Sequence, residues 1–351
     1  MARPKVRIGF VGAGSMGQMA HLQHYTTIED CQVVALAELR QKTGRQIARR
    51  YNVPNYYPEA SAMLAREELD AIVAIQPFTR HGLILNEVLK RGKPVLIEKP
   101  LASSIQIGED IVERMQQNST FIMVGYHKRS DPATMYAKGE IERLKQSGEI
   151  GCLQYVRITI PPGDWVANGF RGMIDEHDNA PELEHDPKPD DVDEKQHQEY
   201  TRFVNYYIHQ VNLLRHLLGE PYQPVFADKS GVLFVGESAS GVTCTLEMTP
   251  YATTRAWQEQ ALVCFERGWV QLDLPAPLTC NRAGNVTIYR DPGDSATPIS
   301  SSPTLPCVAA MQQQALNFVA AVRGRPPMTG AQEALEDLRV ARQYLRLHLG
   351  H

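Results

Sequence analysis

The sequence of 351 residues has no long apolar run, no excess of basic charge and no C-x-x-C cysteine pair, and each absence excludes a class of protein. Its apolar runs are short segments such as residues 71–75, whereas a membrane-spanning helix needs about 20 apolar residues. Lysine and arginine number 36 against 40 acidic residues, which gives a formal net charge of -4. We therefore expect neither a membrane protein nor a protein that binds nucleic acid.

The six cysteines are scattered along the chain, which favours buried thiols in a reducing compartment over a disulfide framework or a zinc site. No histidine spacing matches a standard metal motif, so we expect no bound metal. The first residues run directly into a strand and a glycine loop, without the apolar stretch of a signal peptide. These features together predict a cytoplasmic protein.

Residues 1–125 alternate short apolar runs with helical patterns. Ten to fifteen residues of helical pattern between β-branched runs are typical of a parallel sheet with crossover helices. The first domain is therefore predicted to be a doubly wound Rossmann domain. Its strands are expected at residues 6–11, 33–37, 71–75, 94–97 and 121–124.

Residues 126–351 show a different pattern, with a strand at residues 153–160, a long helix at 203–218 and several alternating strands between 224 and 289. Helices at residues 311–322 and 331–349 close the chain, and the last one is able to pack back on the first domain. The second domain is therefore predicted to be α+β, with a large, mainly antiparallel open sheet that binds substrate and builds oligomers. The whole chain belongs to the α/β class.

An acidic insertion occupies residues 175–199, where eleven acids stand against two lysines and apolar periodicity is almost absent. Such a composition is typical of a solvated surface loop. Long loops in compact domains are also often functional, so a lid over the active site or a subunit arm is the alternative.

The pattern Gly12-x-Gly14-x-x-Gly17 follows a predicted strand and opens a predicted helix. Glycines in this context let backbone N–H groups, including those of Ser15 and Met16, approach a pyrophosphate at the positive end of the helix. Glu38 ends the second strand 21 residues later, where an acid accepts hydrogen bonds from the adenosine ribose. Because this carboxylate would repel a 2′-phosphate, we expect NAD rather than NADP.

The fourth strand ends in Glu98-Lys99-Pro100. Open α/β sheets bind ligands outside the carboxyl ends of their strands, so Lys99 is expected in the same crevice as the glycine loop. Its ammonium group can stabilise developing alkoxide character on a substrate oxygen during hydride transfer.

Six segments together resemble one known family. The segments GFVGAGSMG, IQPFTRH, EKPLA, VGYHKRSDP, NYYIHQVNLLRHLLGE and FVAAVRGRPPMTGAQEALEDLRVA are similar to those of the Gfo/Idh/MocA family, the relatives of glucose–fructose oxidoreductase and inositol dehydrogenase. The resemblance covers nearly the whole chain except the acidic insertion. It implies a Rossmann domain, an open sheet that often builds oligomers, and NAD(P)-dependent oxidation or reduction of a sugar-like alcohol.

The resemblance also implies roles for single residues. Lys99 would lie beside nicotinamide and substrate, and His209 would accept the proton of the reacting hydroxyl. Asn205 stands where many relatives have aspartate; it can orient a hydroxyl but cannot act as a base. The cofactor-binding set is Gly12, Gly14, Ser15, Met16, Gly17, Glu38, Gln76, Pro77, His81, Glu98 and Lys99.

The predicted helix at residues 203–218 carries two stripes. Phe203, Tyr207, Val211, Leu214 and Leu218 recur at i+3 and i+4, and polar residues recur at the same spacing on the opposite side. The apolar stripe is suited to packing on a sheet, while the polar stripe is either solvated or turned to a crevice. Its members are Asn205, His209, Asn212 and His216.

Three further residues are candidates for substrate contacts. His127 and Lys128 follow the fifth predicted strand, at a carboxyl end of the sheet. Trp165 follows a Pro-Pro-Gly turn and could stack on a sugar ring, with packing between domains as the alternative.

We therefore expect an NAD-dependent dehydrogenase of a sugar, glycoside or cyclitol, assembled as a homodimer or homotetramer. The apolar residues of VTCTLEM and ALVCF are expected to be exposed on the open sheet and to form its interface. Two alternatives remain. One is an enzyme that keeps NAD bound and couples oxidation of one sugar to reduction of another, and the other is an NAD-binding regulator without catalysis.

Overall fold

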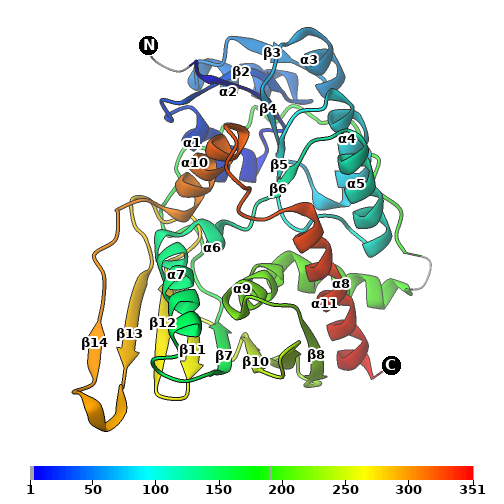
Figure 1. Cartoon of the computed structure of the whole chain (residues 1–351). Coiled ribbons are helices and arrows are strands. Elements are labelled where there is room, and N and C mark those ends of the chain that lie inside the picture. Colours follow the sequence, from blue (N-terminus) through cyan, green and yellow to red (C-terminus); the bar gives the residue numbers. More distant parts are fainter. Residues whose placement is uncertain (1–3, 190–191, 351) are drawn as a thin grey trace. The chain divides into compact units, whose positions relative to one another are not determined.

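The computed structural model describes residues 4–189 and 192–350, which form two compact units (Figure 1). The first unit comprises the residues up to Tyr126 together with Phe170–His197 and Gln314–Leu338. The second comprises His127–Gly169, Gln198–Gln313 and the residues from Arg339 onwards. Asp190 and Asp191 of the acidic insertion lie outside the described residues.

The first unit is built on a six-stranded sheet in the order β3-β2-β1-β4-β5-β6, and every pair in it is parallel. This is the strand order of a Rossmann fold, and it reverses direction beside β1, where ligands bind in such sheets. The strands are β1 (Val6–Val11), β2 (Cys31–Ala37), β3 (Asn55–Tyr57), β4 (Ala71–Ala74), β5 (Val95–Ile97) and β6 (Ile122–Val124).

Helices connect these strands as crossovers. The first begins with a π-helical turn, η1 (Gly17–Leu22), and continues as α1 (Gln23–Tyr25). The others are α2 (Gln41–Arg50), α3 (Ala60–Arg66), α4 (His81–Val88) and α5 (Ile105–Gln117), with short 3₁₀ turns η2 (Phe78–Arg80) and η3 (Leu89–Arg91). The strand β3 and the helix α3 were not predicted, because β3 is short and half exposed and carries little apolar pattern.

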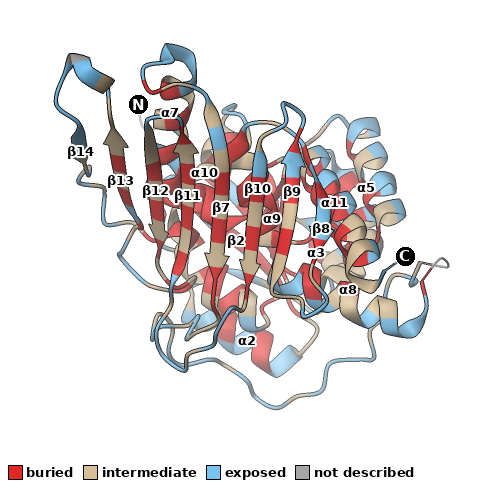
Figure 2. Ribbon diagram, turned by 90° about the horizontal axis from the view of Figure 1, so that it is seen from below, coloured by how far each residue is buried: buried red, intermediate tan, exposed pale blue. Residues whose placement is uncertain are grey.

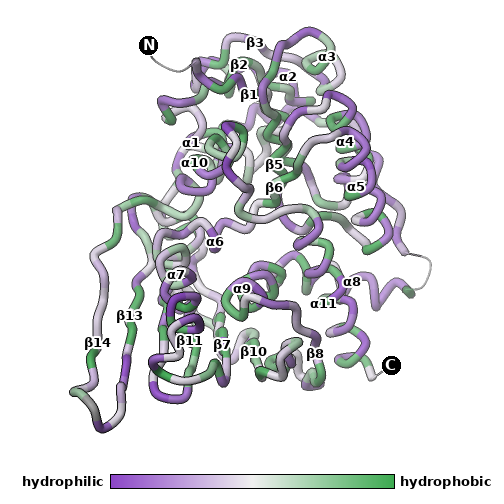
Figure 3. The backbone as a smooth tube through the Cα atoms, in the orientation of Figure 1, coloured by the Kyte–Doolittle hydropathy of each residue, from purple (hydrophilic) through white to green (hydrophobic). Residues whose placement is uncertain are grey.

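A late segment of the chain completes the core of the first unit. Helix α10 (Ala310–Val322) contributes Phe318, which is fully buried and makes edge-to-face contacts with Tyr25 and Phe121. Figure 3 shows β5 and β6 as hydrophobic segments, in keeping with strands that are buried on both faces.

The second unit is built on an eight-stranded sheet in the order β14-β13-β12-β11-β7-β10-β9-β8. All neighbours are antiparallel except β7 and β10, which run parallel. The predicted fold class, a Rossmann sheet followed by a mainly antiparallel sheet, is confirmed. The strands are β7 (Leu153–Ile160), β8 (Tyr222–Ala227), β9 (Leu233–Ser238), β10 (Thr243–Met248), β11 (Glu259–Phe265), β12 (Gly268–Leu274), β13 (Asn285–Arg290) and β14 (Ile299–Ser301).

Helices α7 (Pro132–Ser147) and α9 (Ile208–Leu218) pack on one face of this sheet. Figure 2 shows the other face, where half-exposed residues alternate with buried ones. The apolar residues of VTCTLEM were expected to be exposed on this sheet. That expectation was wrong, because Cys244, Leu246 and Met248 point to the helix-covered face and are fully buried. Of ALVCF, only Leu262 and Cys264 lie on the half-exposed side.

The predicted single helix at residues 203–218 is instead two helices, α8 (Glu194–Tyr206) and α9, which meet at Tyr207. Gln210 N and Val211 N both donate to Tyr207 O, so a new helix begins there. The Tyr207 hydroxyl bonds to that of Thr249, and its ring contacts Phe203. These contacts hold Tyr207 at the bend and outweigh the helical periodicity of the segment. Short helices α6 (His127–Ser130) and η4 (Gly293–Ser295) and the long α11 (Ala331–Leu349) complete the fold.

Candidate active site

A cavity of about 380 Å³ lies in the first unit, at the carboxyl ends of β1, β2 and β4. Of the predicted cofactor residues, Gly12, Gly14, Glu38, Gln76 and Pro77 line it, and Arg40 and Arg80 line it as well. Neither arginine was among the predicted cofactor residues. Ser15, Met16, Gly17, His81, Glu98 and Lys99 are not part of its wall.

The glycine loop has the geometry that a dinucleotide requires. Gly12 has a φ of +86°, and a side chain on it would collide with the carbonyl oxygen of Ile75. A Cβ on Gly17 would stand 2.5 Å from Gly12 O, so the loop can close only with glycine at both positions. At Gly14 a Cβ would point into open space, which leaves room for a pyrophosphate against the backbone.

Glu38 is buried, and its carboxylate binds both the glycine loop and Arg40. Its Oε2 accepts a hydrogen bond from Ala13 N at 2.8 Å. Its Oε1 accepts from the backbone N and side-chain Nε of Arg40, at 3.1 and 3.0 Å. The carboxylate thus faces the cavity with the Arg40 guanidinium bound beside it.

The end of β5 is tied to the glycine-loop helix by a pair that the sequence analysis missed. His21 Nε2 lies 2.6 Å from Glu98 Oε1, and both side chains are buried. Burial alone would raise the pKa of the Glu98 carboxyl, but the hydrogen bond and charge of His21, with Lys99 next in the chain, hold it below its ordinary value. This pair fixes the strand end from which Lys99, itself half-buried, extends.

His81 is fully buried, which lowers the pKa of its imidazole, and its Nδ1 bonds to Leu101 O at 3.0 Å. It anchors the start of α4 in the fold, whereas Arg80 before it lines the cavity and donates to Gln76 Oε1 at 3.1 Å.

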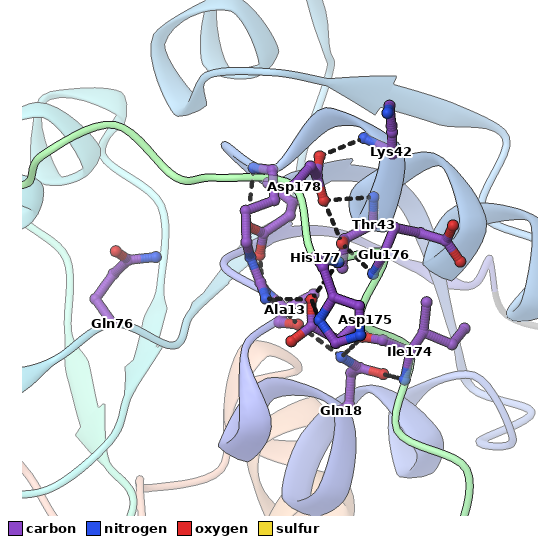
Figure 4. A network of polar contacts seen from close by, with 12 residues as sticks. Ala13, Gln18, Lys42, Thr43, Gln76, Ile174, Asp175, Glu176, His177 and Asp178 are labelled. Carbon is purple, nitrogen blue, oxygen red and sulfur yellow. Dashed lines mark hydrogen bonds and ion pairs between the residues drawn. The ribbon is translucent and has the colours of Figure 1, made fainter.

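Residues 174–186, here called the strap, cross the cofactor cavity, because Ala180 and Leu183 form part of its wall. Asp178 anchors the strap at the start of α2, as Figure 4 shows. Its Oδ2 accepts from Lys42 N at 2.7 Å, and its Oδ1 accepts from Thr43 N and Thr43 Oγ1 at 3.2 and 2.5 Å. These hydrogen bonds, led by that of the Thr43 hydroxyl, hold the pKa of Asp178 below its ordinary value.

A second anchor lies at the other end of the strap. Asp186 accepts hydrogen bonds from Gly82 N and Leu83 N at 2.9 and 3.1 Å, at the start of α4. Its own N–H donates to Thr79 O at 2.6 Å. At the beginning of the strap, the buried side chain of Gln18 exchanges two hydrogen bonds with the backbone of Ile174, of 3.0 and 3.1 Å. The acidic insertion is therefore anchored to the first unit at both ends of the strap, while most of its described side chains between residues 175 and 189 are exposed, as a surface loop requires.

The second unit brings together two of the predicted substrate residues. His127 on α6 and His209 on α9 stand edge to face, with 4.6 Å between ring centroids. His127 is buried and His209 is half-buried. Two imidazoles therefore lie side by side at the start of two helices.

Lys128 is buried in a network that the sequence analysis did not foresee. Its ammonium group pairs with Glu259 Oε2, while Gln210 Nε2 donates to Glu259 Oε1 at 2.7 Å. All three side chains are less than 5% exposed. Glu259, the first residue of β11, thus fastens α6 to α9 directly beside the two histidines, which gives Lys128 a structural role.

The remaining predictions are placed as follows. Asn205 is exposed near the end of α8, four residues before His209 but on the other side of the bend at Tyr207. Asn212, in the predicted polar stripe, is fully buried, so the stripe is not solvated at that position. Trp165 is 40% exposed in the loop after β7.

Most of the residues that were missed have partners that are far away in sequence. Asp178 and Asp186 cap helices more than 100 residues earlier. One signal was present: α2 and α4 are preceded by Arg40 and Arg80, which provide no side-chain cap, so their N–H groups need acceptors from elsewhere.

Neither a metal site nor a membrane-spanning helix is found among the described residues. Among the residues that the structure describes, no group of three or more His, Cys, Asp or Glu side chains is placed to hold a metal ion. Within the same ranges, no helix combines the length and apolar character needed to cross a membrane.

In comparison with known proteins, the first unit matches a family model. Residues 6–126 match the model of an oxidoreductase family with an NAD-binding Rossmann fold. An inositol 2-dehydrogenase of Acidothermus cellulolyticus is 30% identical over 147 residues, which is 42% of each chain. A scyllo-inositol 2-dehydrogenase (NAD(+)) of Bacillus subtilis is 25% identical over 176 residues, 49% of this chain and 50% of that one. The chain thus matches about half the length or less of these curated relatives.

The fold as a whole has close counterparts among solved structures. An NAD binding oxidoreductase from Klebsiella pneumoniae superposes with a TM-score of 0.76 at 16% identity, covering 99% of this chain and 98% of that one. At this identity the likeness concerns the fold, and it extends over both units.

Proposed function

We propose that this chain, whose residues 6–126 match the NAD-binding Rossmann model of the Gfo/Idh/MocA oxidoreductase family, is an NAD(P)-dependent dehydrogenase of that family. The proposed reaction transfers a hydride between nicotinamide and a ring hydroxyl or keto group of a sugar, glycoside or cyclitol. The cavity lined by Gly12, Gly14 and Glu38 is the observation that carries the proposal, because its open glycine backbone and carboxylate fit a dinucleotide. The inositol dehydrogenases among the relatives support this substrate class.

In this proposal, nicotinamide supplies the acceptor or donor of the hydride when it is bound. Lys99 holds the reacting oxygen and stabilises negative charge on it. His209 takes the hydroxyl proton as general base, and Asn205 orients the substrate by hydrogen bonding. A panel of sugars, glycosides and inositols, assayed by the absorbance of reduced nicotinamide with NAD and with NADP, tests the reaction. No reduced nicotinamide with any member of the panel would count against it.

We expect NAD to bind at least several-fold tighter than NADP, because the Glu38 carboxylate faces the cavity and would repel a dianionic 2′-phosphate. Calorimetric titration of the protein with each cofactor measures the ratio. Glu38→Gln should reduce it, while Glu29→Gln, which removes an exposed acid outside the cavity, should leave it unchanged. Equal affinities in the unmodified protein, or tighter NADP, would show that Arg40 dominates the site.

The strap favours a second candidate, an enzyme that keeps NAD bound and couples oxidation of one sugar to reduction of another. A segment that is anchored on both sides of the cavity must detach before the cofactor leaves, so slow release is expected. Nicotinamide that remains with the protein through purification would support this candidate over free exchange.

Replacing Asp178 and Asp186, which anchor the strap, tests whether the strap slows the release of NAD. Alanine at both anchors leaves the first N–H groups of α2 and α4 without their acceptors, so Asp178→Ala with Asp186→Ala should speed NAD release by about tenfold or more. The control is Glu182→Ala, which removes an acidic side chain from the strap without breaking a hydrogen bond between described residues. Stopped-flow displacement of bound NADH measures the rates. Because the Asp178 pKa is lowered in the folded protein, release should also speed up as the pH falls through that pKa. Equal release rates in the double variant and the control would contradict the role of the strap.

The homo-oligomer also remains a proposal. Its support is the half-exposed face of the eight-stranded sheet, where Leu262, Trp269 and Tyr289 lie among polar residues. Cytoplasmic location likewise remains a prediction from the sequence.

A further inference from the structure

A cavity of about 600 Å³ lies in the second unit and shares no lining residue with the cofactor cavity. It lies at the ends of β7, β11 and β12 and is lined by the loops that precede β11 and follow β12. Its size falls within the range of about 300–1,000 Å³ that is usual for small-molecule sites.

The carboxylates in the wall of this cavity already accept hydrogen bonds from the chain. Asp164 Oδ1 accepts from Val166 N and Ala167 N, both at 3.0 Å. Asp273 accepts from the side-chain amides of Gln260 and Gln271, both at 2.9 Å. Glu259 is occupied by Lys128 and Gln210, and the amide oxygen of Gln258 accepts from the Tyr251 hydroxyl.

Three other donor groups in the same wall have no partner among the described residues. No hydrogen bond or ion pair between described residues involves the guanidinium of Arg255 or of Arg282, which are both exposed and carry five N–H donors each. The indole Nε1 of Trp257 is buried and has no partner, so it can donate to a ligand in the cavity. The wall therefore offers free donors, two of them on fixed positive charges, beside carboxylates that already accept hydrogen bonds from the chain.

Arg282 also connects this cavity with the predicted substrate residues. A small recess beside the cavity is lined by His127 and Lys128 and shares Thr279 and Arg282 with it. A ligand held by Arg282 would thus extend toward the His127 side of the second unit.

We propose that this cavity binds an anionic group, a phosphate or carboxylate, at the far end of the carbohydrate substrate, with Arg255 and Arg282 as its ligands. The substrate class is then an acidic sugar, such as a sugar phosphate or a uronate, rather than a neutral inositol. Guanidinium groups bind such planar or tetrahedral oxyanions through paired, charge-assisted hydrogen bonds. This inference rests on the proposed function for the identity of the ligand as a substrate, but the anion site can be tested without turnover.

The first experiment measures binding to the full chain by calorimetry, with glucose 6-phosphate, glucuronate, inorganic phosphate and glucose as probes. We expect at least one of the acidic probes to bind at least tenfold tighter than glucose. The phosphate and glucuronate arms distinguish a phosphate site from a carboxylate site. If no acidic probe binds more tightly than glucose, the inference is wrong.

The second experiment uses variants that remove one charge each. Arg255→Gln and Arg282→Gln should each weaken binding of the acidic probe about tenfold or more, whereas Arg325→Gln, an exposed arginine outside the cavity, should not. Thermal unfolding confirms that the variants are folded. Unchanged affinity in the double variant Arg255→Gln/Arg282→Gln would overturn the site.

The two proposals can fail separately. Turnover of neutral sugars with no arginine-dependent anion binding would refute the anion site and leave the dehydrogenase intact. Arginine-dependent anion binding without nicotinamide reduction on any sugar would uphold the site and refute the proposed reaction.

Discussion

Replacing His209 or Lys99 with alanine is expected to lower kcat by about two orders of magnitude or more, while NAD binding stays near that of the unmodified protein. His209 would no longer take the hydroxyl proton, and Lys99 would no longer stabilise the charge left on the oxygen. Neither side chain lines the cofactor cavity, so the affinity for NAD should not change. Steady-state kinetics on the true substrate and calorimetry with NAD measure the two effects.

Three further variants test whether the loss of kcat is specific to Lys99 and His209. Lys90→Ala, an exposed lysine of η3, should leave kcat unchanged. Asn205→Ala should mainly raise KM, and the double variant of Lys99 and His209 should lose little more than either single variant, because both act on one oxygen. Near-normal turnover in His209→Ala would move the base to another residue. His127, whose ring centroid is 4.6 Å from that of His209, is the next candidate.

Replacing Glu259 with leucine is expected to destabilise the protein by about 3–5 kcal/mol, because it leaves the Lys128 ammonium buried without its counter-charge. Lys128 and Glu259 are 4% and 2% exposed, so solvent cannot compensate. Replacing both partners, as Lys128→Met with Glu259→Leu, should recover much of this loss, since a buried pair can be exchanged for apolar side chains at little cost.

Urea denaturation followed by circular dichroism measures these changes. Glu237→Ala, which removes an exposed acid of β9 in the same sheet, should shift the midpoint little. A Glu259→Leu variant as stable as this control would mean that the pair is not held in the folded protein.

The sequence predicts most elements of this fold because their signals are local. The helix at residues 331–349 and the strand at 153–160 lie where the sequence pattern predicts them. The bend at Tyr207 was missed because the contacts that fix it, with Thr249 and Phe203, are tertiary.

In the candidate site, too, features built from neighbouring residues could be predicted, and contacts between residues far apart in sequence could not. The glycine loop and Glu38 could be predicted, because strand, turn and helix follow one another within 33 residues. A lid was one of the two alternatives for this segment, but the anchors of the strap could not be predicted, because Asp178 and Thr43 are 135 residues apart and only the folded chain brings them together. The partners of Lys128 were hidden for the same reason, since Glu259 follows it by 131 residues.

The contribution of α10 to the first unit constrains the order in which the chain can fold. Phe318 packs against Tyr25 and Phe121, so the nascent first 126 residues leave an apolar surface bare until the ribosome has released residues near position 320. The complete second sheet is synthesised in that interval, so the N-terminal unit completes its core only after that sheet has been made, although its own chain emerges first. A chain truncated before α10 would keep the dinucleotide loop but expose this surface, and exposed surfaces of this kind lead to aggregation.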